Sequence, residues 1–570
     1  MENIFIQLAI ILGLSSVLGL IVFRFKLPLL IAYLLGGLVI ATTAIFDPRA
    51  SQVLHFLPEI GIAFVIFLIG MELDLREIRN LGKPIIFAGT LQILITTIAG
   101  STIAKMLGFG DLETLYLGVG LSFSSTILVI KLLLDKKDIT ALYGKLAVGI
   151  LLLEDLLAII LLLFLTVSTS FLGLGLQQMF PLLTLAVKAV ILFVVAFTLS
   201  RYILNLVFKA VSAQGELLFL TALAWCFIYI SFAILLGFSV VIGAFLAGVA
   251  LASSPYHFQI QSKIKPLRDF FVALFFVYIG TQVNFTAVVE VYPIILIFTA
   301  YTLVAKPLIF LLILGIFGFR KHTMFQTAIS LTHISEFSLI VILLGLNQGV
   351  ISQKTLTVIA LSAVLSMVAA SIMITHASKI YKKLSSLLSF FERKNFAHAL
   401  EDRKNEADLK GHVIIIGAHR VGGEVVKFFK KEKINQLVLD FNPQHVEKLK
   451  KDGINAIYGD MGDPDILEDL KLSEAKMIIS TAQDLNDNLL LLEEIKARRV
   501  TAPVIIRAEN IIEAKELYKK GADFVILPEI LAGDFLVEKL NTHFYDKGFF
   551  TGRAKIELEK LSQKNLATDT

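Results

Sequence analysis

The sequence predicts an all-α polytopic membrane domain followed by a cytoplasmic α/β domain of the Rossmann-like kind. Three observations lead to this fold class. Hydrophobic residues make up 56% of the 570 residues, and the mean hydropathy of +0.79 is too high for a soluble globular chain. Residues 1–383 contain only 40 charged positions, whereas residues 384–570 contain 59. Residues 411–535 then alternate short apolar runs with amphipathic ones, which is typical of a parallel α/β domain.

Thirteen apolar runs in the first part are long enough to cross a bilayer core, which takes about 20 helical residues. They lie at 4–23, 28–46, 56–73, 84–104, 114–134, 144–166, 180–208, 217–236, 238–254, 269–284, 291–318, 323–347 and 355–378. From these runs we expect the following organisation. It comprises a transmembrane domain at 1–383, a helical linker at 384–410, the α/β domain at 411–535 and a charged C-terminal tail at 536–570.

Basic residues orient these spans. The loops after the odd-numbered spans carry nineteen Lys and Arg residues, and the opposite loops carry only Arg49, Lys105 and Lys354. Because basic residues are enriched in cytoplasmic loops, we expect the N-terminus outside and the C-terminal domain in the cytoplasm. The basic excess therefore belongs to the membrane edges and does not indicate nucleic-acid binding. The first residues, MENIFIQ, lack the basic start of a signal peptide, and no small-residue cleavage site follows.

Three ionisable residues fall in the middle of predicted spans. Glu154 and Asp155 lie in GILLLEDLLAIILL, and Lys306 lies in YTLVAKPLIFLL directly before Pro307. A charge at the centre of a bilayer costs several kcal/mol, which makes each a candidate functional residue. Adjacent helix positions point about 100° apart, so the two acids cannot face one partner equally. We expect a role in ion transport, although one acid could be paired structurally and the other solvated. Lys306 fits both a structural pair with a carboxylate and a transported-proton site, and the two interpretations are compatible.

Two further segments resemble interrupted helices. LSFSSTILVI (121–130) places Ser124, Ser125 and Thr126 in an apolar span, and LTHISEFSLI (331–340) does the same with His333 and Glu336. Hydroxyl groups at this depth can satisfy an unwound backbone or replace the hydration shell of a cation, although helix–helix hydrogen bonding is the simpler explanation for either segment alone. Their corresponding places in the two halves of the domain favour a transport site. We expect His333 to be a satisfied polar residue beside the break.

Buried acids of this kind suit proton-coupled transport. A carboxylate removed from water binds a proton more readily, and the same group can instead hold a cation. Competition between the two at one acid is sufficient for antiport when the site faces each side of the membrane in turn. Alkali cations prefer the oxygen ligands that carboxylates, hydroxyls and freed carbonyls provide.

The C-terminal part begins with a nucleotide-binding pattern. HVIIIGAHRVGGEVVKFFKK reads as a buried strand, a glycine-containing turn and an amphipathic helix, and the next strand, QLVLD, ends at Asp440. This layout is that of a dinucleotide-binding half, with the acid placed for a ribose hydroxyl. Gly417 and Gly422 fit the glycine pattern, whereas His419 replaces its middle glycine and would crowd a pyrophosphate. The runs INAIYGD, KMIISTA, PVIIRA and ADFVIL extend the prediction to a six-stranded parallel sheet. A dimerisation module without nucleotide is the alternative.

The single cysteine, Cys226, excludes a disulfide framework and a thiolate metal cluster.

Taken together, the segments resemble a known family. Residues 1–383 are similar to Kef-type monovalent cation:proton antiporters (the cation:proton antiporter-2 type), and 411–535 are similar to their TrkA-N or RCK nucleotide-binding domain. The segments that carry the resemblance are LPLLIAYLLGGLVI, EIGIAFVIFLIGMELDLREI, LSFSSTILVI, GFSVVIGAFLAGVALASS, ISEFSLIV and YGDMGDPDIL. The family fold has thirteen spans, inverted repeats with two crossed broken helices, and a scaffold that forms a homodimer. The organism implied is prokaryotic and the location its cytoplasmic (inner) membrane.

The resemblance also implies roles for particular residues. Asp155 is similar to the acid that binds the monovalent cation, and Lys306 to a lysine that pairs with the preceding acid, here Glu154. The remaining positions implied for ion transport are Ser124, Ser125, Thr126 and Glu336, and those implied for the nucleotide pocket are Gly417, His419, Gly422, Asp440, Asp460 and Arg507. AMP or NAD(H) is the expected nucleotide, and some Kef systems bind an ancillary subunit. Many relatives have Gln-Asp where this chain has Glu-Asp, and electrogenic sodium relatives have Asp-Asp, which leaves the choice between K⁺ and Na⁺ open.

These expectations describe a potassium:proton antiporter that works by elevator-like alternating access and is regulated by nucleotide. It is not an enzyme. One alternative is a sodium:proton antiporter of the same fold, electrogenic through the Glu154–Asp155 pair. A ligand-gated potassium channel would need a TVGYG-type filter, which the sequence lacks. A membrane oxidoreductase would need a hydride acceptor, for which the sequence offers no candidate.

Overall fold

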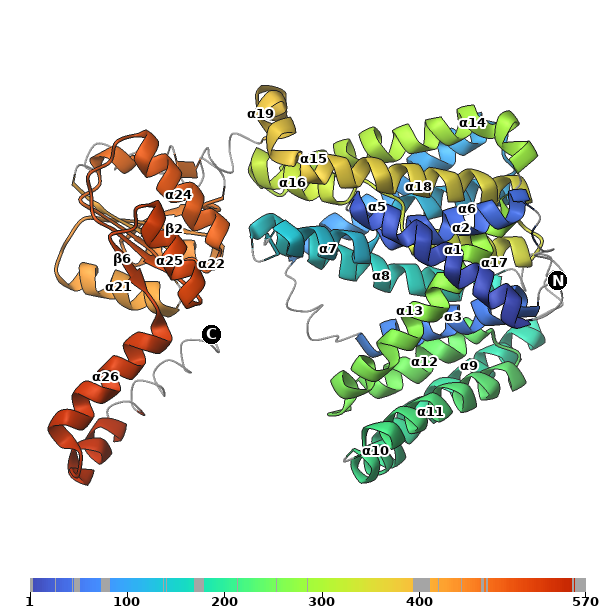
Figure 1. Cartoon of the computed structure of the whole chain (residues 1–570), viewed down its shortest axis with the longest axis horizontal. Coiled ribbons are helices and arrows are strands. Elements are labelled where there is room, and N and C mark those ends of the chain that lie inside the picture. The colour runs from blue at the N-terminus through green and yellow to red at the C-terminus, as the bar shows by residue number, and fades with distance from the viewer. Residues whose placement is uncertain are drawn as a thin grey trace. The chain divides into compact units, whose positions relative to one another are not determined.

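The computed structural model describes residues 4–25, 27–43, 45, 52–72, 83–136, 138–139, 141–168, 179–212, 214–252, 254–283, 285–392, 411–418, 420–441, 443–462, 466–467, 470–555 and 558. The chain divides into two compact units, Met1–Ala397 and His398–Thr570. The first unit is helical and the second contains the sheet (Figure 1). The predicted fold class of a helical membrane domain and a parallel α/β domain is confirmed.

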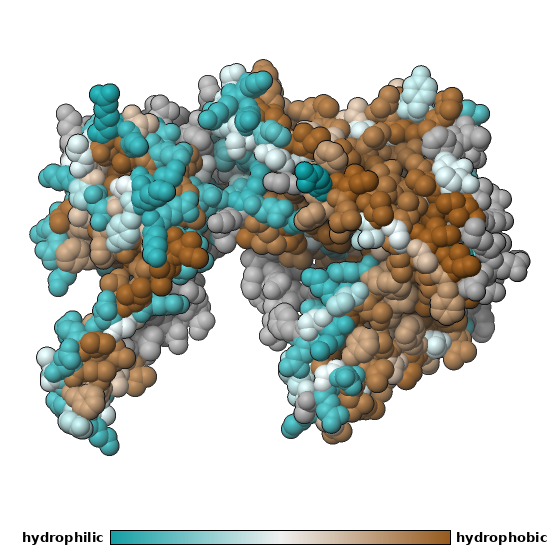
Figure 2. All heavy atoms as spheres, in the orientation of Figure 1, coloured by the Kyte–Doolittle hydropathy of each residue, from teal (hydrophilic) through white to brown (hydrophobic). Residues whose placement is uncertain are grey.

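The helices of the first unit form a bundle with apolar surfaces. In chain order they are α1 (Ile4–Arg24), α2 (Leu29–Thr43), α3 (Gln52–Glu72), α5 (Lys83–Met106), α6 (Asp111–Ser122), α7 (Thr126–Lys136), α8 (Leu142–Ser168), α9 (Met179–Leu199), η2 (Ser200–Leu204), α10 (Asn205–Val211), α11 (Gly215–Leu235), α12 (Val240–Ala252), α13 (His257–Gln282), α14 (Phe285–Ala300), η3 (Tyr301–Ala305), α15 (Lys306–Ile316), α16 (Lys321–Ser330), α17 (Glu336–Asn347), α18 (Gln353–Thr375) and α19 (Ala377–Leu388). Hydrophobic side chains cover most of the bundle surface in view, as expected of a surface that faces lipid (Figure 2).

Helices occupy all thirteen predicted runs, and non-helical segments of three or more residues divide two of those runs. The fifth consists of α6 and α7, and the twelfth of α16 and α17. Within the described residues, seven helical stretches are long and apolar enough to cross a membrane by length and composition. The chain is therefore a multi-pass membrane protein with a soluble C-terminal domain, while the number of thirteen spans remains a prediction.

Close backbone contacts join pairs of helices into rigid bodies. A Cβ at Gly37 of α2 would lie 2.0 Å from the Val277 carbonyl oxygen of α13, and one at Gly280 would lie 2.2 Å from the Leu34 carbonyl oxygen. The α3–α12 pair is equally tight, since a Cβ at Gly248 would lie 2.1 Å from the Phe67 carbonyl oxygen. Only glycine fits at these three positions, so the backbones of each pair are in direct contact.

The second unit is a doubly wound sheet. Its strands are β1 (Val413–Ile416), β2 (Gln436–Asp440), β3 (Asn455–Tyr458), β4 (Met477–Ser480), β5 (Val504–Arg507) and β6 (Phe524–Ile526), all parallel, in the order β3-β2-β1-β4-β5-β6. The described helical elements are α21 (Arg420–Lys431), α22 (Pro443–Lys451), η5 (Leu472–Glu474), α24 (Leu485–Ala497), α25 (Ile511–Lys520) and α26 (Pro528–His543). Alternate β1 residues enter two separate core clusters, Ile414 in one and Ile415 in the other. Both faces of the sheet are therefore buried, as parallel strands require.

Two of the predicted domain boundaries fall inside helices of the structure. Helix α26 runs through residue 535 into the segment expected to be a tail, and residues 547–555 of that segment are helical too. The expected linker at 384–410 begins inside α19, and its residues 393–410 lie outside the described residues.

Candidate functional site

The two interrupted helices hydrogen-bond to each other where they break. The Ser335 amide donates to the Phe123 carbonyl oxygen at 3.1 Å, and the Ser125 amide donates to Nε2 of His333 at 2.9 Å. Residues 123–125 separate α6 from α7, and residues 331–335 separate α16 from α17. Each break leaves helix-terminal backbone groups without partners in its own helix, and the opposite break supplies some of those partners.

Glu154 of α8 is fully buried beside the first break. Its Oε2 accepts from the Ser124 amide at 2.6 Å, and Lys306 Nζ donates to the Ser124 hydroxyl at 2.9 Å and to the His333 carbonyl oxygen at 3.4 Å. Glu154 and Lys306 both bond to Ser124, and no direct ion pair within 4.0 Å joins them in the described part of the chain. Ser124 stands between the acid and the lysine and contacts both.

Asp155 meets the same break from the neighbouring position. The Thr126 hydroxyl, at the start of α7, donates to Asp155 Oδ2 at 2.8 Å. Asp155 is partly exposed whereas Glu154 is not. The two acids therefore bond to different residues of one break, as their angular separation on α8 requires, and Asp155 is the more accessible of the two.

The second break carries polar atoms that lack protein partners. The Ser335 hydroxyl caps α17 by accepting from the Phe337 amide at 3.1 Å, and the Ser125 side chain faces the buried Glu336 carboxylate. The described residues provide no hydrogen-bond partner for Glu336 Oε2 or for His333 Nδ1. The expectation that His333 is satisfied therefore holds for one ring nitrogen only.

Sequence reasoning missed two features of this site. Gln92 of α5 is fully buried and donates to the Ser122 carbonyl oxygen at 2.9 Å, which satisfies the last carbonyl of α6. A lone amide in the run FAGTLQILITT was the available signal. The other feature is the π-helical turn η3, in which the Lys306 amide donates to the Tyr301 carbonyl oxygen. Pro307 cannot donate a backbone hydrogen bond, and this turn accommodates the gap directly ahead of the lysine.

In the glycine-containing turn of the second unit, the backbone at Gly422 lies against the backbone at Gly417. Gly417 follows β1 with φ +82°, and a Cβ at Gly422 would lie 1.7 Å from the Gly417 carbonyl oxygen, so only glycine fits there. Asp440, at the end of β2, accepts from the Ala418 amide at 2.7 Å. The acid expected to bind a ribose thus holds the turn itself. Thr481 of the β4 end, which sequence reasoning missed, donates to the Gly417 carbonyl oxygen at 2.9 Å.

The other predicted nucleotide residues lie at the carboxyl ends of neighbouring strands. Asp460 follows β3 and accepts from the Gly462 amide at 3.1 Å, and Arg507 ends β5 with its Nε atom lacking a partner among the described residues. Desolvation, with the Asp460 charge, raises the pKa of Tyr458 to about 12, so this phenol stays neutral at physiological pH. Strand order reverses between β1 and β4, which is where such sheets bind ligands. His419 lies outside the described residues.

The fold and the two breaks define a class: a helical membrane transporter with acids at crossed, interrupted helices and a Rossmann-like soluble domain. The family model "Sodium/hydrogen exchanger, transmembrane" matches residues 10–379, and the TrkA-N domain model matches residues 413–528. The chain belongs to the sodium/hydrogen exchanger family. The resemblance to Kef-type antiporters with a TrkA-N domain is confirmed, and the protein is a transporter and not an enzyme.

Similar proteins cover nearly the whole chain. The chain is 27% identical over 540 residues to a putative K(+) efflux antiporter, KefB, of Alkalimonas amylolytica, covering 94% of this chain and 81% of that protein. It is 28% identical over 528 residues to the glutathione-regulated potassium-efflux system protein KefC of Salmonella schwarzengrund, covering 92% and 82%. Among solved structures, the sodium proton antiporter MjNhaP1 of Methanocaldococcus jannaschii is similar with a TM-score of 0.46 and 14% identity, over 67% of this chain and 98% of that one.

Proposed function

We propose that this protein exchanges K⁺ for H⁺ across the cytoplasmic membrane of a prokaryote, with Asp155 as the carboxylate that binds them in turn. The observation that carries the proposal is the arrangement at the first break, where Thr126 bonds to Asp155 while Ser124 contacts both Glu154 and Lys306. This geometry gives one partly accessible acid with a hydroxyl group bonded to it. Potassium is the proposed cation because the similar KefB and KefC proteins are named for its efflux.

The Glu154–Lys306 pair sets the stoichiometry in this proposal. A buried carboxylate and a buried ammonium that compensate each other add no net charge to the site. Asp155 then exchanges one H⁺ for one K⁺, and the cycle is electroneutral. Ser125 of the first break and Glu336 beside the second complete the polar lining that the cation meets.

The test is proton flux in proteoliposomes under a pH gradient, with K⁺, Na⁺, Li⁺ or Rb⁺ added in turn and with the membrane potential clamped or free. A K⁺ response that is the same with and without the clamp supports the proposal. A Na⁺ response that depends on the clamp would instead support electrogenic exchange through Glu154 and Asp155. Absence of any response, with AMP or NADH also present, would refute both.

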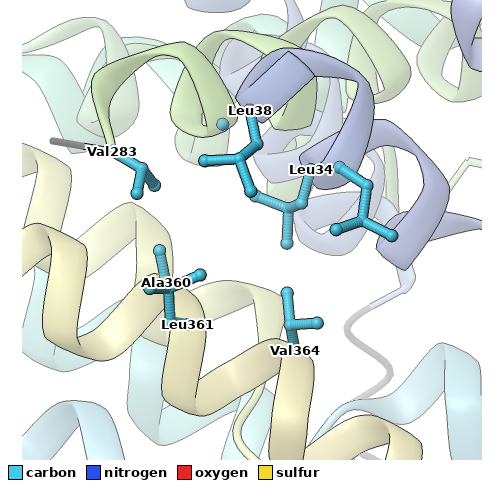
Figure 3. A pocket seen from close by; sticks show the side chains of 8 residues that line it. Leu34, Leu38, Val283, Ala360, Leu361 and Val364 are labelled. Atoms are coloured by element: carbon cyan, nitrogen blue, oxygen red, sulfur yellow. The ribbon is translucent and has the colours of Figure 1, made fainter. Parts of the chain in front are cut away.

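Alternating access is proposed to be elevator-like, with the interrupted helices moving against the glycine-packed pairs α2–α13 and α3–α12. A small groove lies where α2 and α13 meet α18, and only apolar residues and one glycine line it (Figure 3). Its side chains include Leu34 and Leu38 on one side and Leu361 and Val364 on the other. Along this apolar lining, one body can slide past the other without breaking hydrogen bonds.

A polar contact closes this boundary at one end. Gln353, at the start of α18, donates to both the backbone and the side-chain oxygen of Gln282, at the end of α13. The same end of α18 is tied to α6, because Glu113 accepts from the Ser352 amide at 2.8 Å. Movement of the interrupted helices must break the first contact and can keep the second.

Cysteine pairs distinguish these two contacts. Oxidation of a Gln282→Cys, Gln353→Cys chain should block exchange, and a reductant should restore it, because the disulfide joins the two bodies. The matched pair Glu113→Cys, Ser352→Cys lies within one body and should leave exchange intact after oxidation. Cys226 is fully buried and does not interfere. Full exchange in the oxidised first pair would exclude relative movement at this boundary.

Nucleotide binding to the TrkA-N domain is proposed to regulate exchange. Gly417 and Gly422 shape the turn, while Asp440, Asp460 and Arg507 surround the point where strand order reverses. Regulation requires that AMP or NAD(H) bind the two transport states with different affinity. Calorimetry of the purified chain with each nucleotide, repeated with Asp440→Asn, tests the site. Unchanged affinity in the variant would move the ligand elsewhere.

The proposed assembly is a homodimer, to which an ancillary subunit could add. Helix α26 has no buried residue, and it exposes Leu531, Phe535 and Leu536. An exposed apolar helix of this kind marks an interaction surface, and a second copy of the chain is the proposed partner. Mass measurement in detergent with and without Phe535→Asp and Leu531→Asp tests this.

The proposed orientation, with the N-terminus outside, rests on the nineteen basic residues of one set of loops against three on the other.

A further inference from the structure

Helix α19 combines three different surfaces in one short segment. It begins after His376 ends α18, and it runs across the end of the bundle instead of continuing α18 (Figure 1). Its packed side contains Ala377, Tyr381 and Leu388, which are buried. The ring of Tyr381 lies 4.9 Å from that of His322 and 5.7 Å from that of Phe325, both of α16. Helix α19 is therefore fastened to one half of an interrupted helix.

The second surface of α19 is apolar and uncovered. Leu384 is 37% exposed, Leu387 is 68% exposed, and Phe390, just past the helix end, is 86% exposed. Their spacing of three residues places them along one side, next to the packed side. Exposed large apolar residues in a row are costly in water and indicate a surface that another apolar phase covers.

The third surface is basic. Lys379, Lys382 and Lys383 are exposed, and residues 377–391 contain no acidic residue. Within the described residues, no ion pair joins these lysines to an acidic group. Hydrophilic residues gather at this end of the bundle beside its hydrophobic surface (Figure 2). A helix with apolar side chains on one side and lysines beside them is typical of segments that lie in the headgroup region of a bilayer.

We propose that α19 is an interfacial helix that binds anionic phospholipid headgroups on the side of the membrane that carries the soluble domain. Leu384, Leu387 and Phe390 enter the acyl boundary, and the three lysines contact the phosphates. The position of α19 in the chain supports lipid as the partner. It directly follows α18, which is long and apolar enough to cross the membrane, so α19 begins at the membrane surface. Because Tyr381 fastens α19 to α16, the leaflet holds one half of the interrupted helix in place, and exchange becomes sensitive to lipid charge.

The soluble domain of the same chain is the competing partner, since residues 384–570 carry 31 acidic against 28 basic residues. It would recognise the lysines but has no need of the apolar side. A dye whose emission reports contact with hydrocarbon therefore distinguishes the lipid bilayer from the soluble domain as the partner of α19. Leu387→Cys carries an environment-sensitive dye into the proposed lipid side, and Ser378→Cys, nine residues earlier, carries it to the opposite side of the helix.

The full-length protein is labelled and reconstituted in neutral phosphatidylcholine vesicles, with or without one quarter phosphatidylglycerol. Lipid-borne quenchers should quench the dye at 387 and not at 378, and phosphatidylglycerol should increase that quenching. Replacing Lys379, Lys382 and Lys383 by Gln should remove the increase, since each lysine contributes about a five-fold preference for an anionic surface. The matched triple Lys427, Lys430 and Lys431 to Gln, on exposed α21, should leave it unchanged.

Two outcomes would overturn the proposal. Equal, water-like emission at both positions in both lipids would show that α19 lies outside the bilayer. Emission at 387 that is already blue-shifted in detergent and returns to the water-like value on adding nucleotide would show that the soluble domain covers the helix. In the expected case, the rate of cation exchange also changes with phosphatidylglycerol in the wild type and not in the α19 triple variant.

Discussion

The two interrupted helices differ in what their breaks offer. At the first break, the amides of Ser124 and Ser125 donate to Glu154 and to His333, and the Phe123 carbonyl oxygen accepts from the Ser335 amide. At the second break, the carbonyl oxygens of Leu331 and His333 accept from the Ser124 hydroxyl and from Lys306. The first break is also fixed to α8 by two acids, whereas the second retains buried polar atoms without partners. One break is therefore held in a single arrangement, and the other has spare capacity to bind water or a cation.

The substitution Asp155→Asn should have the largest effect on exchange, and it tests the role given to the first break. The amide retains the hydrogen bond from Thr126 but cannot exchange a proton, so cation-dependent proton flux should be abolished while the protein remains folded. Flux and the melting temperature of the detergent-purified protein measure both effects. Asp135→Asn, at the exposed end of α7, is the matched control. Full exchange in Asp155→Asn would place the transport site elsewhere.

Lys306→Gln should have the next largest effect. It leaves the buried Glu154 carboxylate without its compensating charge, which costs about 3–5 kcal/mol of folding free energy. Thermal unfolding should show the loss, and the pH profile of exchange should shift. The double variant Glu154→Gln, Lys306→Gln should recover much of the stability, because both charges are removed together. If the double variant is no more stable than the single one, the two groups are not a pair.

Ser335→Ala tests the second break. It removes the cap of α17 and should cost about 1 kcal/mol. Ser352→Ala removes the equivalent cap of α18, where the hydroxyl accepts from the Thr355 amide at 3.3 Å, and should cost a similar amount. Only Ser335→Ala should change the cation concentration that gives half-maximal exchange. An equal change in both variants would mean that general destabilisation is responsible.

The smallest effect is expected from Ser338→Ala. Its buried hydroxyl has no partner within the described residues, so its removal should be neutral or slightly stabilising in thermal unfolding. Ser124→Ala at the first break loses contacts to Glu154 and Lys306 and should be clearly destabilising. Similar melting temperatures for the two variants would remove the difference between the breaks.

Periodicity and composition could predict the helical runs, the two interruptions and the parallel sheet, because each follows from local sequence. The hydroxyl clusters at 121–130 and 331–340 marked both breaks. Which groups meet could not be predicted. That Ser124 stands between Glu154 and Lys306 depends on how three distant helices pack, and the buried amide of Gln92 belongs to a fourth. The π-helical turn before Lys306 likewise depends on a backbone register that Pro307 suggests but does not determine.

The bond between Asp440 and the Ala418 amide has a consequence for how tightly the soluble domain can hold a ligand. The Ala418 amide occupies Asp440 Oδ2, so a ribose hydroxyl that takes this oxygen must break an existing bond, which cancels part of its binding energy. Such a pocket suits a metabolite that comes and goes with its concentration, as opposed to a permanently bound prosthetic group.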